Sequence, residues 1–242
     1  MKKYQEEFRI RYSDCDRFGK LKLRAVFDYA QEIAGNHATL LGCGDQLREH
    51  RSLAWILSRM RVRMLEWPKS ETQVHVETWP SGFNRLFATR EFRFRTGKEQ
   101  RVFAEGTSYW LLFNLETQRL AITQKEMEGL NLDTDDAERI FQNLDKLKGE
   151  EDAPVIAEFQ VYEHQIDINH HLNNAEYAAF LQDALGYGCY PSELQINFQK
   201  EVPPQSKISI CGHKDAESFS FSGFVGEEEV FLAEGTLFRP SC

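Results

Sequence analysis

The chain has 242 residues, of which 41% are hydrophobic, and it carries a formal net charge of −9. This length and apolar content suffice for one large core or two small ones, and the negative charge argues against nucleic acid as a partner. No apolar run approaches the roughly 20 residues that span a bilayer, and the first residues lack the apolar stretch of a secretory signal. These features predict a cytoplasmic protein without a membrane partner.

The charge is distributed unevenly along the chain. Residues 1–123 hold 21 Lys and Arg against 15 Asp and Glu, a balance of +6, whereas residues 124–242 hold 8 against 23, a balance of −15. Complementary charge guides protein association, so the basic first part can receive an acidic partner. Two differently solvated surfaces would give the same counts, and the charges alone do not distinguish these interpretations.

Five cysteines lie far apart, and none forms a Cys-x-x-Cys pair. An odd, scattered set indicates reduced thiols rather than a disulfide framework. No neighbour in the sequence offers a base to activate one of them, so we expect structural thiols. The five are Cys15, Cys43, Cys189, Cys211 and Cys242.

The first half of the chain predicts one strand, one long helix and four further strands. Phe8, Ile10 and Tyr12 alternate with polar residues, as in a half-buried strand. A polar, glycine-containing crossing at 16–22 follows. Apolar residues at helical spacing then predict a helix that ends at Gly42 and Gly44. Their positions are 26, 29, 30, 33, 34, 37 and 41, and strands are expected over 54–64, 72–78, 86–95 and 102–114.

The second half repeats this order, which indicates a duplicated domain. Sequence matches recur at shifts of 151, 136 and 129 residues, in the same order along both halves. The matched segments are 7–10 with 158–161, 68–70 with 204–206, and 104–107 with 233–236. The expected elements are a strand over 159–163, a helix over about 173–185, and strands over 194–200, 207–212, 218–226 and 230–239.

One long helix followed by four strands suits an antiparallel sheet wrapped around that helix, which is the element order of the hot-dog fold. We therefore predict an α+β tandem hot-dog whose two sheets lie side by side as an internal pseudo-dimer. The first unit is expected over 1–123, an acidic connector over 124–157, and the second unit over 158–242. We expect the connector to be a solvated tether with a short helix near 135–147. A monomer and a homodimer both remain open.

The halves differ at the crossing before the long helix. Residues 16–22 are Asp-Arg-Phe-Gly-Lys-Leu-Lys, and residues 167–173 are Asp-Ile-Asn-His-His-Leu-Asn. Only the aspartate is shared as a polar group, whereas Asn169 and His171 stand where the first half has Phe and Lys. If one half carries chemistry, the comparison favours the second.

The local chemistry also favours a site there. Asn173 is expected to cap the following helix, with Glu176 completing a capping box. Asp167, Asn169 and His171 would then lie beside a helix N-terminus, where free N–H groups and the helix dipole favour an oxyanion. A histidine and a carboxylate supply a general base for water.

Two other interpretations of this loop remain open at this point. Asn, Asp and His side chains commonly bond their own backbone in turns, without any catalytic role. A metal site built from Glu163, His164, His170 and His171 is a further option, but its spacing matches no helical His-x-x-x-His ligand pair. We predict no metal and no cofactor.

Residues 167–177, Asp-Ile-Asn-His-His-Leu-Asn-Asn-Ala-Glu-Tyr, resemble the Asp-x-Asn-x-His-x-Asn-Asn signature of the acyl-acyl carrier protein (ACP) thioesterases of plant plastids and their bacterial relatives. Segments at 8–12, 31–37 and 55–59 are also similar to that family. The resemblance implies a double hot-dog fold and the release of fatty acids from ACP.

The resemblance also implies the catalytic positions Asp167, Asn169 and His171, and a glutamate after the strand that contains Asn-Phe-Gln-Lys, here Glu201. The plant enzymes have a cysteine directly after this glutamate, whereas this chain has Val202. A thiol nucleophile at that position is therefore excluded, which favours a mechanism with carboxylates, His171 and water. Covalent attack by Asp167 and orientation of water by Asp167 both stay open, as do action of Glu201 on His171 and on water.

In that family the first half buries most of the acyl chain. The resemblance therefore implies apolar tunnel walls in the first half, although ordinary core packing explains the same residues. Arginines that alternate along the strand over 54–64 share one face of the sheet and are expected to dock the acidic ACP. The residues expected to bind substrate are Phe27, Trp55, Arg61, Arg63, Asn173 and Asn174.

Three alternative functions are compatible with a hot-dog fold. The first is a thioesterase that acts on acyl-coenzyme A (acyl-CoA). The second is a dehydratase of 3-hydroxyacyl thioesters, although the Asp-x-Asn-x-His run with Glu201 does not suit its pattern. The third is a non-catalytic acyl-binding protein, which the retention of Asn169, His171 and Glu201 together disfavours.

Overall fold

An antiparallel sheet of eleven strands forms the body of the protein in the computed structural model, which describes residues 3–97, 100–121, 123–127, 134, 136–150, 152–186 and 188–238. The first half supplies β1 (Tyr4–Arg9), β2 (Leu53–Met64), β3 (Gln73–Asn84), β4 (Phe87–Thr96), β5 (Arg101–Asn114) and β6 (Arg119–Leu120). The second half supplies β7 (Val155–Gln160), β8 (Pro191–Phe198), β9 (Lys207–Lys214), β10 (Ser218–Val225) and β11 (Glu228–Leu237). The spatial order is β1-β3-β4-β5-β2-β8-β11-β10-β9-β7, with β6 paired to β5.

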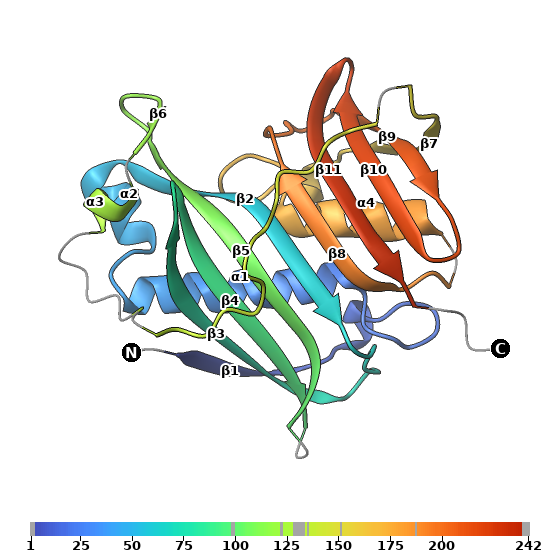
Figure 1. The fold of residues 1–242 in the computed structure, drawn as a ribbon, viewed down its shortest axis with the longest axis horizontal. Coiled ribbons are helices and arrows are strands. Elements are labelled where there is room, and N and C mark those ends of the chain that lie inside the picture. The colour runs from blue at the N-terminus through green and yellow to red at the C-terminus, as the bar shows by residue number, and fades with distance from the viewer. Residues whose placement is uncertain are drawn as a thin grey trace.

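The pairing of β2 with β8 joins the two halves into one sheet (Figure 1). Its antiparallel register extends from Arg59 opposite Asn197 to Arg63 opposite Glu193. Without this pairing each strand would present an edge of unsatisfied N–H and C=O groups. The order β3-β4-β5-β2 in the first half matches β9-β10-β11-β8 in the second, which confirms the predicted tandem hot-dog.

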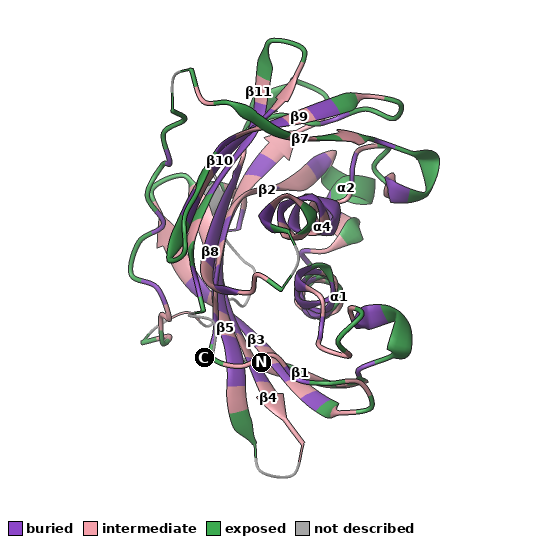
Figure 2. Cartoon of the chain, turned by 90° about the vertical axis from the view of Figure 1, so that its right-hand side faces the viewer, coloured by how far each residue is buried: buried purple, intermediate pink, exposed green. Residues whose placement is uncertain are grey.

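Two long helices, α1 (Leu23–Leu40) and α4 (Asn174–Leu185), lie side by side on the concave side of the sheet (Figure 2). Their inward residues share one apolar core with the sheet, as the helical spacing predicted. Val26, Ile33, Ala178 and Leu181 are fully buried there. No helix among the described residues is long and apolar enough to cross a membrane.

Several shorter elements differ from the sequence predictions. Helix α2 (Asp45–Arg51) follows the predicted end of α1 and was missed, because seven residues are too short for a periodic pattern. β1 ends at Arg9, and Tyr12 instead begins the 3-10 turn η1 (Tyr12–Asp14), whose counterpart in the second half is η2 (Glu163–Gln165). Helix α3 (Thr123–Glu126) is short, and β7 starts at Val155, inside the expected connector.

The connector crosses the convex face of the sheet, and we call its residues 136–150 the strap (Figure 1). Residues 136–147 form no helix, so the helix expected near 135–147 is wrong there, and residue 135 lies outside the described residues. The expected solvated tether is also wrong, because Phe141, Leu144 and Leu147 are buried. Burial of these apolar side chains against the sheet stabilises an extended crossing over a free helix.

A fully buried carboxylate, Glu91 on β4, anchors the strap to the sheet. Its oxygens accept hydrogen bonds from the hydroxyls of Ser81 (2.6 Å) and Thr107, and from the backbone N–H of Ile140 in the strap (3.1 Å). The Thr107 hydroxyl in turn accepts the N–H of Phe141 (3.2 Å). A buried carboxylate is tolerated where such donors replace water.

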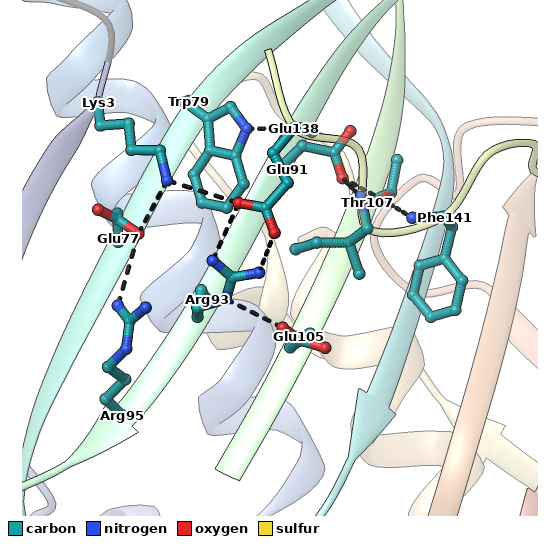
Figure 3. A network of polar contacts seen from close by, with 11 residues as sticks. Lys3, Glu77, Trp79, Glu91, Arg93, Arg95, Glu105, Thr107, Glu138 and Phe141 are labelled. Carbon is teal, nitrogen blue, oxygen red and sulfur yellow. Dashed lines mark hydrogen bonds and ion pairs between the residues drawn. The ribbon is translucent and has the colours of Figure 1, made fainter. Parts of the chain in front are cut away.

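Ion pairs on the same face hold the start of the strap (Figure 3). Arg93 binds Glu138 of the strap through two contacts of 2.6 and 3.1 Å and also pairs with Glu105 at 2.9 Å. The indole N–H of Trp79 donates to the Glu138 carbonyl at 2.8 Å. The strap is therefore fastened by backbone and side-chain contacts together.

We predict that Glu91→Leu lowers the free energy of unfolding by about 2–4 kcal/mol, because the buried Ile140 N–H and two hydroxyls lose their acceptor. Glu91→Gln retains an acceptor of the same shape and is the matched control. Urea unfolding of the wild type and both variants measures the difference. Equal stability of Glu91→Leu and the wild type would contradict the anchoring role.

We also predict how the stability difference between the wild type and Glu91→Gln changes with pH. Burial raises the pKa of Glu91, so its folded-state pKa exceeds the unfolded value. The neutral form of Glu91 therefore favours folding, and this contribution is fully present below the unfolded pKa. It is lost as the pH rises through the folded pKa, because ionisation of the buried group disfavours folding. The stability of Glu91→Gln relative to the wild type should therefore increase from about pH 4.5 upward.

Candidate active site

The loop at 167–171 is held by its own aspartate. Asp167 Oδ1 accepts the backbone N–H of Asn169 at 2.8 Å and that of His171 at 3.5 Å. The backbone of Asp167 also bonds the His171 carbonyl (2.9 Å) and the N–H of His170 (3.0 Å). These four bonds make a compact turn in which the side chains of Asn169 and His171 project from a fixed backbone.

The first half contains the same turn without the same side chains. Asp16 Oδ1 accepts the N–H groups of Phe18 (2.8 Å) and Lys20 (3.0 Å), and its backbone bonds match those of Asp167. Gly19 has a φ of +73° and His170 a φ of +66°, so the second half holds a histidine in a conformation that favours glycine. The aspartate therefore shapes the turn in both halves, whether or not the half carries the other polar groups.

His171 and Glu201 meet at the end of β8. His171 Nε2 lies 2.8 Å from Glu201 Oε2, and the two side chains are 39% and 61% exposed, so both groups contact solvent. The N–H of Leu172 donates to the carbonyl of Val202 at 3.0 Å, which fastens the loop to the segment after β8. This backbone bond brings together residues that are far apart in the sequence.

Tyr177 on α4 shows that Asp167 and Glu201 share one side of the site. Its ring is buried and packs edge-on against Phe198 and Phe231. Burial raises the pKa of the Tyr177 hydroxyl, and the negative charges of Glu201 and Asp167 raise it further. The structure thus gathers the four sequence-predicted catalytic positions, with Asn169 and His171 on one turn and the two carboxylates near one ring.

The N-terminus of α4 is capped as predicted, but not by a capping box. Asn173 Oδ1 accepts the N–H of Ala175 at 2.8 Å. Glu176 instead turns to Gln165 (3.1 Å) and to Arg24 of the first half (2.8 Å), because its buried carboxylate needs a cation. Since Asn173 also accepts the Glu176 N–H through its carbonyl, two first-turn donors are already used. The predicted oxyanion role of this helix end is weaker for that reason.

Asn174 is the first residue of α4, half-buried beside the cap. It lies next to the predicted catalytic turn in the chain. No hydrogen bond of its side chain is recorded among the described residues, so its expected role in substrate binding stays a prediction.

Arg48 of α2 reaches the turn from the first half and was missed by the sequence analysis. Its Nη1 donates to Asn169 Oδ1 at 2.7 Å. A guanidinium only donates, so this bond orients the Asn169 amide with Oδ1 toward Arg48 and leaves Nδ2 3.5 Å from Asp167 Oδ2. The three basic residues of α2 were visible in the sequence, but nothing there paired residue 48 with residue 169.

A cavity of about 470 Å³ extends from this turn into the first half. Ile168 and Asn169 line it from the second half, and Arg48 lines it from the first half. Trp55 lies along the cavity, as expected of a tunnel wall, whereas Phe27 is 3% exposed in the core and is not among the lining residues. The other walls come from α1, α2 and strands β2 to β5.

Arg61 and Arg63 lie on the convex face of the sheet, away from the cavity. Both bind Glu193 of β8, Arg63 at 3.0 Å, and both guanidinium groups stack over Phe141 of the strap at 4.7 and 4.8 Å. The predicted shared face of the two arginines is confirmed, and it is the face of the strap. Their expected role in docking ACP stays a prediction. Sequence alternation identifies a common face without saying which side of the sheet it is.

The equivalent place in the first half is filled by Tyr190. Its hydroxyl donates to Asp16 Oδ2 at 2.6 Å, and Lys20 Nζ lies 4.1 Å from the ring centroid. Trp67 packs on the same ring with centroids 5.2 Å apart. The N–H of Leu21 donates to the Pro68 carbonyl as that of Leu172 does to Val202, so the structural match here differs by two residues from the sequence match of 68 with 204. Lys20 and Trp67 thus take the backbone positions of His171 and Glu201, and the first-half turn lacks their pairing of a histidine with a carboxylate.

The described residues contain no cluster suited to a metal ion and no thiol placed for nucleophilic catalysis. No three His, Cys, Asp or Glu side chains there gather as a metal site. Cys15, Cys43, Cys189 and Cys211 are free thiols, and Cys242 lies outside the described residues. Burial raises the pKa of Cys15 and Cys43, which disfavours the reactive thiolate.

Comparison with known proteins matches both halves of the chain to one family. The model described as acyl-ACP thioesterase N-terminal domain matches residues 1–129, and the model described as acyl-ACP thioesterase C-terminal domain matches residues 148–230. A chloroplastic palmitoyl-ACP thioesterase of Gossypium hirsutum is 24% identical over 75% of this chain and 46% of its own length. A chloroplastic oleoyl-ACP thioesterase of Coriandrum sativum is 21% identical over 93% of this chain and 64% of its own length. The chain thus spans less than two thirds of either relative.

Solved structures share the fold over nearly the whole chain. An acyl-ACP thioesterase from Bacteroides thetaiotaomicron superposes with a TM-score of 0.86 at 20% identity and covers 98% of each chain. A 12:0-ACP thioesterase from Umbellularia californica superposes with a TM-score of 0.78 at 22% identity, covering 98% of this chain and 97% of that one.

We predict that Arg48→Met lowers kcat/KM of the reaction at this turn by about tenfold, because a hydrogen bond from a charged donor to Asn169 is lost. Arg51→Met is the matched control, since Arg51 belongs to the same helix but binds Glu126 instead. Steady-state assays of both variants measure the effect. A similar loss in both would attribute the change to α2 as a whole and contradict a specific role of Arg48.

Proposed function

The chain belongs to the acyl-ACP thioesterase family, and on that premise we propose that it hydrolyses the thioester of a fatty acyl group carried by ACP. Water adds to the thioester carbonyl, the C–S bond breaks, and the products are a free fatty acid and the ACP thiol. The observation that carries this proposal is the His171–Glu201 contact of 2.8 Å beside a turn that lines the first-half cavity.

His171 is the proposed general base. With Nε2 facing the Glu201 carboxylate, an acceptor, the proton of the neutral ring resides on Nε2 and the Nδ1 lone pair is left for a proton from water. Glu201 then stabilises the imidazolium that forms, so its role is to act on His171 rather than on water directly. This pairing also fixes the direction of the ring.

Asn169 and Asp167 are proposed to position the substrate and the turn. The Arg48 bond directs the Asn169 amide so that an Nδ2 proton is available for the thioester oxygen as it gains negative charge. Asp167 Oδ1 already accepts two backbone N–H groups, as Asp16 does in the half without these chemical groups. This shared role supports Asp167 as the residue that holds the turn, in preference to a covalent nucleophile.

The cavity is proposed to bury the acyl chain. Ile168 and Asn169 of the proposed catalytic turn line it at one end of the predicted path, and Trp55 and Trp110 give it apolar walls. The acyl group would therefore cross from the second half, where its thioester reacts, into the first half. ACP is the proposed carrier on family grounds, and the cation that lines the cavity beside the turn is Arg48 rather than Arg61 or Arg63. A cytoplasmic location stays a prediction, as do the monomeric and homodimeric alternatives.

We predict that His171→Asn lowers kcat/KM for acyl-ACP by about 10²–10⁴-fold, as expected for loss of a general base. His170→Asn is the matched control, because His170 is the exposed neighbour with positive φ, a conformation that asparagine adopts readily. Turnover of a panel of acyl-ACPs by the wild type and both variants measures the difference.

Undiminished turnover by His171→Asn would contradict the assignment of the base. Matched acyl-ACP and acyl-CoA substrates should be run in the same assay, and a higher kcat/KM for acyl-CoA would favour the alternative carrier. Absence of turnover with either carrier by the wild type would overturn the proposed function itself.

A further inference from the structure

An arginine lines the cavity among its apolar walls. Arg90 lies on β4, and its side chain points to the helix side of the sheet, opposite to that of its neighbour Glu91. Its Nη1 donates to His37 Nδ1 of α1 at 3.1 Å and to Thr78 Oγ1 at 3.3 Å. His37 and Thr78 are both 0% exposed, so the guanidinium reaches deep into the first half.

The charge of Arg90 has no carboxylate partner within the part of the chain that the structure describes. Burial lowers the pKa of Arg90 to about 10, with a smaller opposing effect from Cys43, so the side chain is still a cation at neutral pH. The two acidic residues that line the cavity, Glu32 and Asp45, are exposed residues of α1 and α2. A buried cation bonded only to neutral groups is costly, and an anionic ligand would offset that cost.

The position of Arg90 is remote from the proposed catalytic turn. Arg90 is on β4, which is separated from β2 by β5, and Glu201 follows β8 on the other side of β2. With strands about 4.8 Å apart, β4 lies about 14 Å from β8 across the sheet. An acyl chain whose thioester is held at the turn would therefore approach Arg90 with its distal part.

We propose that this cavity accepts acyl groups whose distal end carries an oxygen acceptor, and a carboxylate best of all. This inference rests on the proposed thioester hydrolysis and adds the chemical class of the acyl group. A terminal carboxylate forms charge-assisted hydrogen bonds with the guanidinium, and a hydroxyl forms weaker ones. A terminal methyl group offers no acceptor to the guanidinium N–H groups that His37 and Thr78 do not bind, and it cannot balance the positive charge, which is how polar sites reject apolar analogues.

The test compares acyl-ACPs of matched chain length whose chains end in a methyl, a hydroxyl or a carboxylate group, over a series of lengths. We expect kcat/KM at the best length to be about tenfold or more higher for the carboxylate than for the methyl, with the hydroxyl between them. Arg90→Met should abolish this order and raise the relative turnover of the methyl-terminated chains. Arg90→Lys retains the charge and should retain the order at reduced magnitude.

Arg95→Met is the matched control, because Arg95 is on the same strand but pairs with Glu77 on the other face. It should leave the order unchanged. A wild-type preference for methyl-terminated chains, or the same order in Arg90→Met, would overturn this inference while hydrolysis itself persists. Absence of turnover of every acyl-ACP would instead overturn the proposed function. If Arg90→Met does not fold, the order of kcat/KM values for the three chain ends in the wild type and in Arg90→Lys tests the inference instead.

Discussion

The backbone pairing of β2 with β8 is the interaction on which the rest of the structure depends. It converts two sheets with exposed edges into one, and it fixes where the halves stand relative to each other. Glu201 follows β8, and the first residues of β2 line the cavity, so the seam also places the chemical groups of one half near the cavity of the other. The packing of α1 on α4 supports the same junction from one side. On the other side Arg59 of β2 and Gln195 of β8 donate to neighbouring carbonyls of the strap.

The two halves contain the same turn, and the side chains on the two turns make different contacts. Asp16 and Asp167 accept the same backbone N–H groups, which shows that the aspartate is needed to shape the turn. In the first half Tyr190 from the other half fills the space over the turn. In the second half Arg48 from the other half contacts Asn169 instead and leaves His171 exposed to solvent. Each turn is thus completed by a residue of the opposite half.

Charged side chains on the two faces of the sheet differ in whether they have a partner of opposite charge. On the convex face Glu91 is surrounded by donors, and Arg61, Arg63 and Arg93 are matched by carboxylates, so the charges fasten the strap and the seam. On the concave face Arg90 borders the cavity with neutral partners. The arginines of the convex face thus hold the strap and the seam through carboxylates, whereas an unmatched guanidinium at a cavity favours an anionic ligand.

The sequence by itself determined the duplication and the element order, because strand alternation, helical spacing and the repeat are visible along the chain. Comparison of the halves singled out positions 169 and 171 beside the shared Asp167, whereas position 201 came from the family resemblance alone. It did not reveal α2, the packing of the strap, or the face on which Arg61 and Arg63 lie, since alternation is the same on both faces of a sheet. Only the tertiary structure paired Arg48 with Asn169 and brought Arg90 to the cavity. Those contacts join residues distant in the chain, and the register between strands and helices that creates them is set by packing.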